Sequence, residues 1–332
     1  GRRAAAENEG WCINALGESA AEFNLSYDVN ALGQFAAQQN SGWAVNAMGS
    51  SAARYNSSYI VNAFGPQACE LNSGASVNAM GHLAAQDNDG SEVNTFGAMA
   101  GQFNTKSSLN ALGNSAAKNN TGSSVNALGP SAAENNTGDD VNALGLYAAV
   151  GNTNYSVNAF GVYAAGYNSG HNLNAFGSSA AQFNSGIHVN AIGQSAAANN
   201  SGWHVIAVGY ESAYYNNGND AIAIGQMALR GSETNGEGDG NIGIGYQAGM
   251  NIGAGFNNIA IGYDVPVPDG DLSDQINIGN SIIRDADGVI TLNDVIQLPA
   301  LTSPPSNPQA GMIYFDGAML YCYDGDFWQA LW

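Results

Sequence analysis

Aromatic residues recur at one position of this chain, spaced by multiples of 16 residues. Exposed aromatic residues often mark binding surfaces, and Trp and Tyr side chains stack on sugar rings while donating hydrogen bonds. We therefore hypothesise a glycan-binding stripe formed by Trp11, Tyr27, Trp43, Tyr59, Tyr155 and Trp203. The alternative is that these rings pack against one another or against a neighbouring chain.

A second column places an asparagine in each of twelve consecutive repeats. Its members are Asn14, Asn30, Asn46, Asn62, Asn78, Asn94, Asn110, Asn126, Asn142, Asn158, Asn174 and Asn190. The next repeats hold isoleucine at this position, beginning with Ile206 and Ile222. We therefore expect a buried asparagine ladder, because buried amides need hydrogen-bond partners and stacked asparagines supply them. The alternative is a polar channel on the axis of an oligomer, holding waters or ions.

No catalytic residue, metal site or cofactor site is predicted. The carboxylate pairs Asp87 with Asp89 and Asp139 with Asp140 lie on expected turns, with no insertion that would form a cleft. His188 and His204 share one repeat position and are expected to stack, but two histidines do not make a metal site without a third ligand. The chain has 3 cysteines, too far apart in sequence to indicate a disulfide framework or a zinc site.

The net charge of the chain excludes some classes of binding partner. Lys and Arg number 7 against 27 Asp and Glu, which gives a net charge of −20. Such a chain repels phosphate backbones, so we expect no nucleic-acid partner. Asparagine interrupts each apolar run well before the length of about 20 residues that a membrane span needs, so we expect no membrane insertion.

The dominant feature is a 16-residue repeat, V-N-A-Φ-G-x-x-A-A-x-x-N-S/T-G-x-x, where Φ is hydrophobic. This period is too short for the common helical repeats of about 33–47 residues. In the V-N-A-Φ segment, Val and Ala face one side and Asn and Φ face the other. We expect A-A-x-x-N to supply a second strand, so that stacked coils form two parallel sheets. The fold class is an all-β, parallel β-roll or β-solenoid with 16-residue coils.

A roll built on alanine pairs is thin, and each coil has a second hydrophobic face. The simplest cover for that face is another copy of the chain. Closed rotational symmetry satisfies all copies equally, so we expect a homo-oligomer, a homotrimer in the favoured arrangement.

Four segments are predicted along the chain. Residues 1–10 form an N-terminal extension, and residues 11–230 form the regular β-roll. Residues 231–282 continue the roll irregularly after an acidic loop. Residues 283–332 form a C-terminal β-hairpin module with a Pro-rich connector and Asp-Gly turns.

Two groups of motifs resemble known families. Ala223-Ile224-Gly225-x-x-Ala228 and Asn258-Ile259-Ala260-Ile261-Gly262-Tyr263 resemble the haemagglutinin-like head repeats of trimeric autotransporter adhesins and are similar to repeats of bacteriophage tail-fibre proteins. The tail, from Gly311-Met312-Ile313-Tyr314 to Phe327-Trp328, resembles small β-modules near the C-terminus of phage tail fibres. The resemblance implies a trimeric, left-handed β-roll that binds cell surfaces.

The sequence thus favours a non-enzymatic trimeric fibre or adhesin. We expect a phage tail fibre that contacts host-surface glycans through many weak contacts, which multivalency strengthens. The expected location is extracellular, in a virion or a cell-surface appendage. The alternatives are a secreted bacterial adhesin or self-assembling extracellular filament and, more remotely, a glycan-degrading tailspike.

Overall fold

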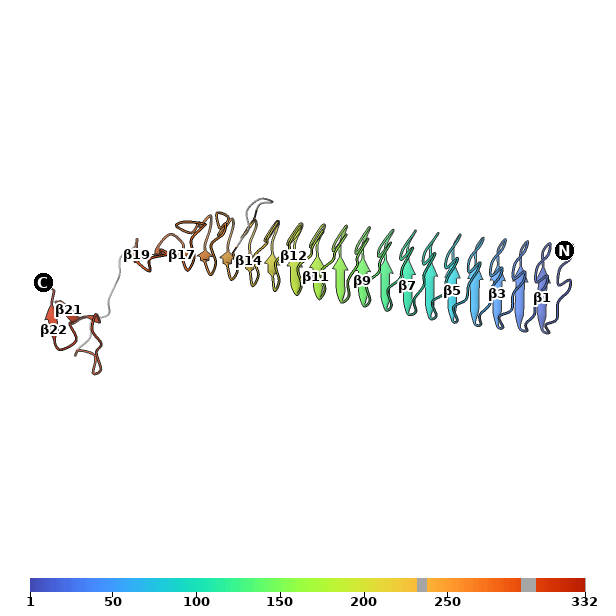
Figure 1. Cartoon of the computed structure of the whole chain (residues 1–332), viewed down its shortest axis with the longest axis horizontal. Helices are drawn as coiled ribbons and strands as arrows, with labels where there is room; N and C mark the ends of the chain where they lie inside the picture. The colour runs from blue at the N-terminus through green and yellow to red at the C-terminus, as the bar shows by residue number, and fades with distance from the viewer. Residues whose placement is uncertain (232–237, 294–302, 332) are drawn as a thin grey trace.

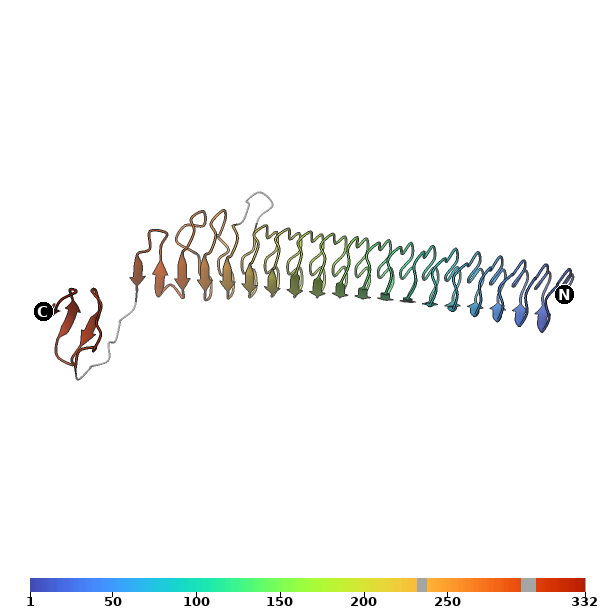
Figure 2. The same ribbon diagram turned by 60° about the horizontal axis from the view of Figure 1, so that its bottom comes forward.

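The computed structural model is a long solenoid in which each coil contributes one short strand (Figure 1). The structure describes residues 1–231, 238–293 and 303–331. Strands β1 to β17 pair in parallel with the strand of the next coil, and equivalent residues lie opposite each other, as in Val29 with Val45. Figure 2 shows the strands in a row along one side of the rod, with the turns on the other side. The predicted all-β, parallel β-solenoid is confirmed.

The strands fall into two lengths. Twelve have four residues: β1 (Ile13–Leu16), β2 (Val29–Leu32), β3 (Val45–Met48), β4 (Val61–Phe64), β5 (Val77–Met80), β6 (Val93–Phe96), β7 (Leu109–Leu112), β8 (Val125–Leu128), β9 (Val141–Leu144), β10 (Val157–Phe160), β11 (Leu173–Phe176) and β12 (Val189–Ile192). Five have three residues: β13 (Ile206–Val208), β14 (Ile222–Ile224), β15 (Ile242–Ile244), β16 (Ile259–Ile261) and β17 (Ile276–Ile278). We call the two sets of coils the Asn coils and the Ile coils.

The interior of each Asn coil is built from very few side chains. Val29 and Ala31 point inward from β2, and Ala36 and Ala37 meet them from the turn segment that follows. All four are buried, whereas the asparagine and the last residue of the strand point outward. The predicted alternation of the V-N-A-Φ segment is confirmed, because successive side chains of a strand face opposite sides.

The predicted second strand, over A-A-x-x-N, is wrong. This segment consists of turns in which every other residue has a positive φ, as at Ser19 (53°), Ala21 (50°) and Phe23 (56°). The backbone amides still bond to neighbouring coils: that of Ser19 donates to the carbonyl of Arg2, and that of Ala21 donates to Ala36. Alternating left-handed residues turn successive peptide groups toward opposite neighbours, so the ladder of hydrogen bonds continues without strand geometry. There is one parallel sheet in the solenoid, not two.

A buried asparagine column closes each coil after the turn segment. Asn40 donates from Nδ2 to Oδ1 of Asn24 at 2.8 Å and to the carbonyl of Gly42 at 2.6 Å, and its Oδ1 accepts from Asn56. These bonds satisfy the amides in a dry interior. The column comprises Asn24, Asn40, Asn56, Asn72, Asn88, Asn104, Asn120, Asn136, Asn152, Asn168, Asn184, Asn200 and Asn216.

The glycine that follows each strand permits the close stacking of the coils. Gly33 has a φ of 136°, which residues with a Cβ rarely adopt. A Cβ on Gly33 would also lie 2.5 Å from the carbonyl oxygen of Gly49 in the next coil. Glycine is therefore required here by both the backbone angle and the spacing.

The segment boundaries need two corrections. Residues 1–10 are not an extension: their backbone is in register with the next coil, and the amide of Phe23 donates to the carbonyl of Ala6. The roll continues after the acidic loop as predicted, because Ile222 pairs with Ile242; residues 232–237 of the loop lie outside the described part. The boundary at residue 283 falls inside β18 (Ile282–Arg284), which with β19 (Ile290–Leu292) extends the solenoid sheet in antiparallel fashion.

The C-terminal module is a separate three-stranded antiparallel sheet. It contains β20 (Ile313–Phe315), β21 (Leu320–Tyr323) and β22 (Trp328–Ala330). Asp316 and Asp324 each accept two backbone N–H groups in the turns that join the strands. These hydrogen bonds lower the pKa of both carboxyl groups. The predicted hairpins with Asp-Gly turns are confirmed.

Candidate functional site

The outward side of the strands forms a continuous stripe, which we call the outer strand face. In the Asn coils it consists of the asparagine column and, two residues further on, an apolar column. The apolar column comprises Leu16, Leu32, Met48, Phe64, Met80, Phe96, Leu112, Leu128, Leu144, Phe160, Phe176 and Ile192. Several of these side chains are more exposed than a folded domain usually leaves them, among them Leu16 at 65% and Leu112 at 53%. Exposed apolar surface this continuous indicates an interaction site.

The asparagines of the outer strand face hydrogen-bond along the rod. Nδ2 of Asn14 donates to Oδ1 of Asn30 at 2.8 Å, and Asn30 donates to Asn46 at the same distance. The ladder continues to Asn190, always with the donor on the N-terminal side. The burial predicted for this column is wrong for the single chain, because Val and Ala occupy the inward positions. The isoleucine that suggested burial, Ile206, is itself exposed.

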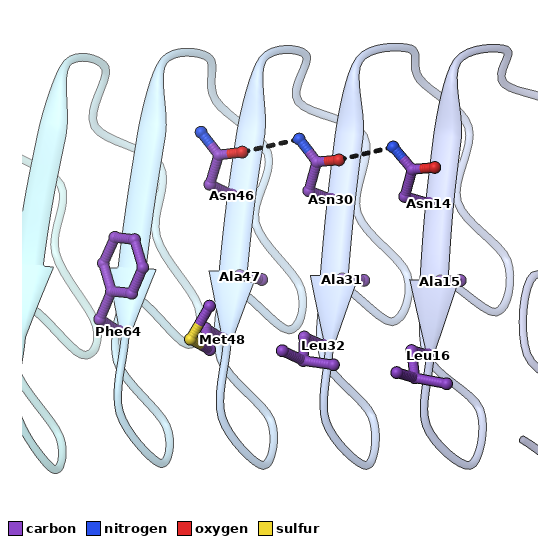
Figure 3. A pocket seen from close by; sticks show the side chains of 10 residues that line it. All are labelled: Asn14, Ala15, Leu16, Asn30, Ala31, Leu32, Asn46, Ala47, Met48 and Phe64. Carbon is purple, nitrogen blue, oxygen red and sulfur yellow. Dashed lines mark hydrogen bonds between the residues drawn. The ribbon is translucent and has the colours of Figure 1, made fainter.

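A groove of about 450 Å³ runs between the two columns over the first coils. In Figure 3 the amides of Asn14, Asn30 and Asn46 form one wall, and Leu16 and Leu32 lie along the other. The alanines between them form the floor. The groove continues over the following coils as a second hollow of about 320 Å³, lined by residues from Asn62 to Phe96.

The outer strand face is also uncharged. Neither column contains Asp, Glu, Lys or Arg in any Asn or Ile coil, although the chain as a whole carries a net charge of −20. The acidic groups therefore lie on the turns, in the loop and in the C-terminal segments. This face is the part of the rod on which a second negatively charged rod meets the least repulsion.

The first four rings of the aromatic column form one stack. Trp11 and Tyr27 have ring centroids 5.4 Å apart, Tyr27 and Trp43 are 6.1 Å apart, and Trp43 and Tyr59 are 5.1 Å apart. All four residues are exposed. The faces of the two middle rings are thus directed at neighbouring rings, and a ligand meets mainly ring edges there.

The other two residues of the proposed stripe lie in separate surroundings. Tyr155 stacks on His171 at 4.8 Å. Trp203 is half exposed and stacks on no ring within the described residues. The structure therefore brings together four of the six aromatic residues. Of the other two, Trp203 is the one whose ring is not stacked on another ring.

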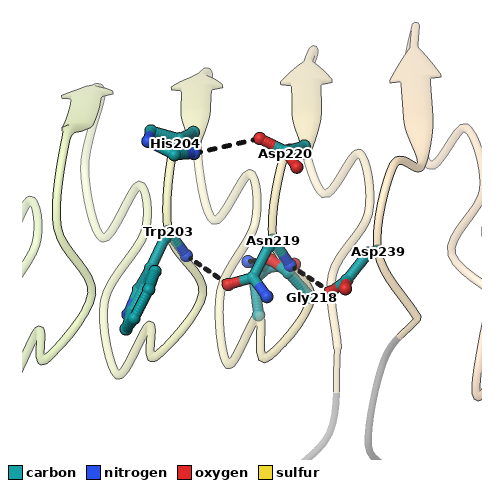
Figure 4. A network of polar contacts seen from close by, with 7 residues as sticks. Trp203, His204, Gly218, Asn219, Asp220 and Asp239 are labelled. Carbon is teal, nitrogen blue, oxygen red and sulfur yellow. Dashed lines mark hydrogen bonds and ion pairs between the residues drawn. The ribbon is translucent and has the colours of Figure 1, made fainter.

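Polar contacts lie beside the backbone of Trp203, and its ring points away from them (Figure 4). The backbone amide of Trp203 donates to Oδ1 of Asn219 at 2.8 Å, and the amide of Asn219 donates to Oδ1 of Asp239 at 2.7 Å. On the adjacent column, Nδ1 of His204 lies 3.0 Å from Oδ1 of Asp220. His188 stacks on His204 at 5.0 Å with nearly parallel rings, as predicted.

Three other residues that could take part in chemistry lie apart from the outer strand face. Burial, together with the nearby Glu70 and Asp89 carboxylates, raises the pKa of Asp87. Asp139 accepts the backbone amide of Ser123 in the neighbouring coil at 2.7 Å, so it links two coils. Cys69 replaces a buried alanine, and burial raises the pKa of its thiol.

Within residues 1–231, 238–293 and 303–331 the structure places no group of three or more His, Cys, Asp and Glu side chains so that they could hold a metal ion. The same residues contain no helix that is long and apolar enough to cross a membrane. No family model, curated protein or solved structure matches this chain. The arguments about function therefore begin from the rod and its outer strand face.

Proposed function

We propose that this chain is a non-enzymatic fibre or adhesin whose copies associate side by side through the outer strand face. The observation that carries the proposal is the uncharged, apolar stripe along the whole solenoid. The proposed location is extracellular, as a phage tail fibre or a related surface appendage. The resemblance of the repeats and of the C-terminal module to tail fibres supports this location.

A second copy is the occupant that best suits the outer strand face. The face is long and repetitive, so a ligand that covers it must repeat along the same rod (Figure 2). A copy of the chain repeats at the same interval and presents the same uncharged surface. Buried apolar area contributes about 25 cal/mol per Å², so a contact that runs along many coils is strongly favourable.

We propose three copies around one axis parallel to the rod. Closed rotational symmetry lets each copy bury the same stripe without leaving an open edge. The three asparagine columns then lie near the axis, where their remaining donors and acceptors bond across the interface or to water. The turns, with the acidic and aromatic residues, face outward.

Host-surface glycans are the proposed ligands of the outward turns. A trimer displays three copies of the stack from Trp11 to Tyr59 and three copies of Trp203. Single sugar contacts of this kind are weak, but linked sites bind 10²–10⁴-fold more tightly than either site alone when their geometry matches.

The mass in solution tests the association. Light scattering should give about 102 kDa, three times the 34.0 kDa of one chain. A species of 34 kDa at all concentrations would contradict side-by-side association. A mass of about 68 kDa would be compatible with association through the outer strand face but would contradict the threefold arrangement.

A binding assay tests the ligand class. The variant Trp43→Ala with Tyr59→Ala should lose at least tenfold in binding to a panel of immobilised neutral oligosaccharides. The matched control is Tyr167→Ala with Phe183→Ala, another exposed stack, with ring centroids 5.3 Å apart. Equal binding by native chain, variant and control would contradict a role for the stack.

A further inference from the structure

We propose that the change from asparagine to isoleucine between Asn190 and Ile206 fixes the axial register and the parallel direction of the associated copies. This inference rests on the proposed function, because it assumes that copies meet through the outer strand face. It assigns a different role to each end of that face. The Asn coils provide length, and the Ile coils determine which coil of one copy lies beside which coil of another.

The Asn coils cannot set a register by themselves. Each asparagine uses one Nδ2 hydrogen and accepts one hydrogen bond at Oδ1 along the ladder, at 2.7–3.0 Å. An amide has a second hydrogen and a second lone pair, and both remain for contacts across the interface. The same set recurs at every coil, so a partner that slides by one coil, about 4.8 Å, finds the same donors and acceptors.

In the Asn coils, the apolar column does little to distinguish an aligned partner from a slipped one. It contains leucine, methionine, phenylalanine and, at its last position, isoleucine in no regular order, and all of these side chains are large and apolar. Exchanges among such residues are tolerated when the total volume is kept. A slipped arrangement would therefore pack nearly as well as the aligned one.

The Ile coils break this equivalence because both outward columns become apolar. The outward pairs are Ile206 with Val208, Ile222 with Ile224, Ile242 with Ile244, Ile259 with Ile261, and Ile276 with Ile278. Several are well exposed in the single chain, with Ile206 at 40% and Ile278 at 39%. Their positions in parallel register continue the two columns of the Asn coils, as in Asn190 with Ile206.

A slip of one coil brings Asn190 of one copy opposite Ile206 of another. The free amide groups of Asn190 then lose water and gain no partner, which is unfavourable for buried polar groups. Each further coil of slip adds another such mismatch. An antiparallel arrangement that overlaps the whole rods would place the Ile coils against Asn coils. Among arrangements with full overlap, only parallel, aligned copies therefore match isoleucine with isoleucine.

The solenoid itself does not require isoleucine at these outward positions. The neighbouring inward positions, which hold Ala207, Ala223 and Ala260, are buried inside the coil. The five isoleucines thus expose apolar surface that burial against another copy would remove.

Spin-label distances between copies test the register. The label is placed at Thr121→Cys, an exposed turn position, in a chain that carries Cys12→Ser and Cys322→Ser. The test variant changes Ile206, Ile222, Ile242, Ile259 and Ile276 to asparagine, which makes the column uniform. The matched control changes the same five residues to valine, which keeps the column apolar. Mass is measured on each sample.

Native and control chains should give one narrow distance. The asparagine variant should give a broad distribution, with axial offsets in steps of about 4.8 Å, or dissociate to the mass of one chain. The same narrow distance in the asparagine variant would overturn the proposal, as would a broad distribution in the native oligomer, and both results would leave the proposed association intact. A native protein that is a monomer throughout would instead overturn the proposed function.

Discussion

The Asn coils and the last three Ile coils carry an amide on opposite sides of the strand. In the Asn coils the inward residue at the start of the strand is apolar, as at Val141, and the next residue outward is an asparagine. In the last Ile coils the inward residue is an amide, at Asn241, Asn258 and Gln275, and the outward residue is isoleucine. The polarity of the two faces is therefore exchanged without a change of register in the sheet.

The exchange shows which polar groups the fold needs. Oδ1 of Asn258 accepts the backbone amide of Gln275 at 2.9 Å, and Oδ1 of Asn241 accepts that of Asn258 at 2.9 Å. These bonds take over the role of the buried asparagine column, which ends at Asn216 among the described residues. The outer asparagine ladder has no such replacement. A buried amide is thus part of every coil, whereas an outer amide is dispensable for folding.

The largest expected effect comes from removing a buried amide. Asn104 donates to Oδ1 of Asn88 and to the carbonyl of Lys106, and accepts from Asn120. Asn104→Ala leaves buried Oδ1 of Asn88 without a donor, removes the donor to the carbonyl of Lys106 and takes one acceptor from Asn120, so it should lower the free energy of unfolding by about 3 kcal/mol. The measurement is urea-induced unfolding at fixed chain concentration.

The matched control is Asn110→Ala in the outer ladder of the next coil. Asn110 also bonds to two neighbours, but both variants are compared as dissociated single chains, in which Asn110 is exposed and water replaces the lost partners. We expect a change of about 0.5 kcal/mol. Equal losses for the two variants would contradict the distinction between buried and outer amides.

A smaller effect is expected where one Asn coil differs from the consensus at two positions. Thr95 stands where most coils have alanine, and Gly101, with a φ of 62°, stands where most have the second alanine of the turn. A Cβ on Gly101 would lie 2.5 Å from Cγ2 of Thr95. Gly101→Ala should therefore destabilise the chain by about 1–3 kcal/mol.

Thr95→Ala should rescue this variant, because it removes the methyl group that the new Cβ meets. It also removes a buried hydroxyl without a hydrogen-bond partner. The backbone angle does not limit the rescue, since Ala117 has a similar φ of 51° at the equivalent position of the next coil. Double-mutant unfolding measurements would contradict this account if the two changes were additive.

The smallest effect concerns pH and the C-terminal module. Backbone hydrogen bonds hold the pKa of Asp316 and Asp324 below the value of an unfolded chain, about 3.9. A lowered pKa in the folded state stabilises the module above the unfolded pKa, and this stabilisation disappears as the pH falls through the folded pKa. Trp328 fluorescence during urea unfolding should show a loss of stability below about pH 4.

Asp316→Asn with Asp324→Asn is the control for the pH dependence. The amide oxygens still accept the two backbone N–H groups in each turn but no longer titrate. Its stability should be nearly constant in the same pH range. A double variant that remained as sensitive to acid as the native module would show that other groups are responsible.

Much of the fold follows from the repeat, and the failures have physical causes. The alternation of V-N-A-Φ determines which side chains are inward, and the 16-residue period determines that equivalent residues stack. The turn segment was missed because alternating left-handed residues such as Ala21 and Ala37 have no sequence signature outside glycine and asparagine. A pair of alanines is equally compatible with a β-strand and with this turn.

The candidate site was less predictable for a related reason. The replacement of the outer asparagines by isoleucine in later coils was interpreted as a sign of burial. It shows only that this outward position accepts an apolar side chain. The buried column, such as Asn24 and Asn40, had a recognisable signal in the sequence: an asparagine that precedes the turn in nearly every coil. The stacking of the aromatic column follows from the 16-residue period. The direction in which each ring face points could not be predicted from the sequence and follows only from the three-dimensional structure.

The most direct test of the central claim places charge on the outer strand face. Sedimentation is compared for the native chain, for Leu112→Glu with Leu144→Glu, and for the control Thr121→Glu with Thr137→Glu at exposed turn positions. The native chain and the turn control should sediment as the same oligomer, and the face variant should sediment as a 34.0 kDa monomer. A face variant that kept the native mass would contradict association through the outer strand face.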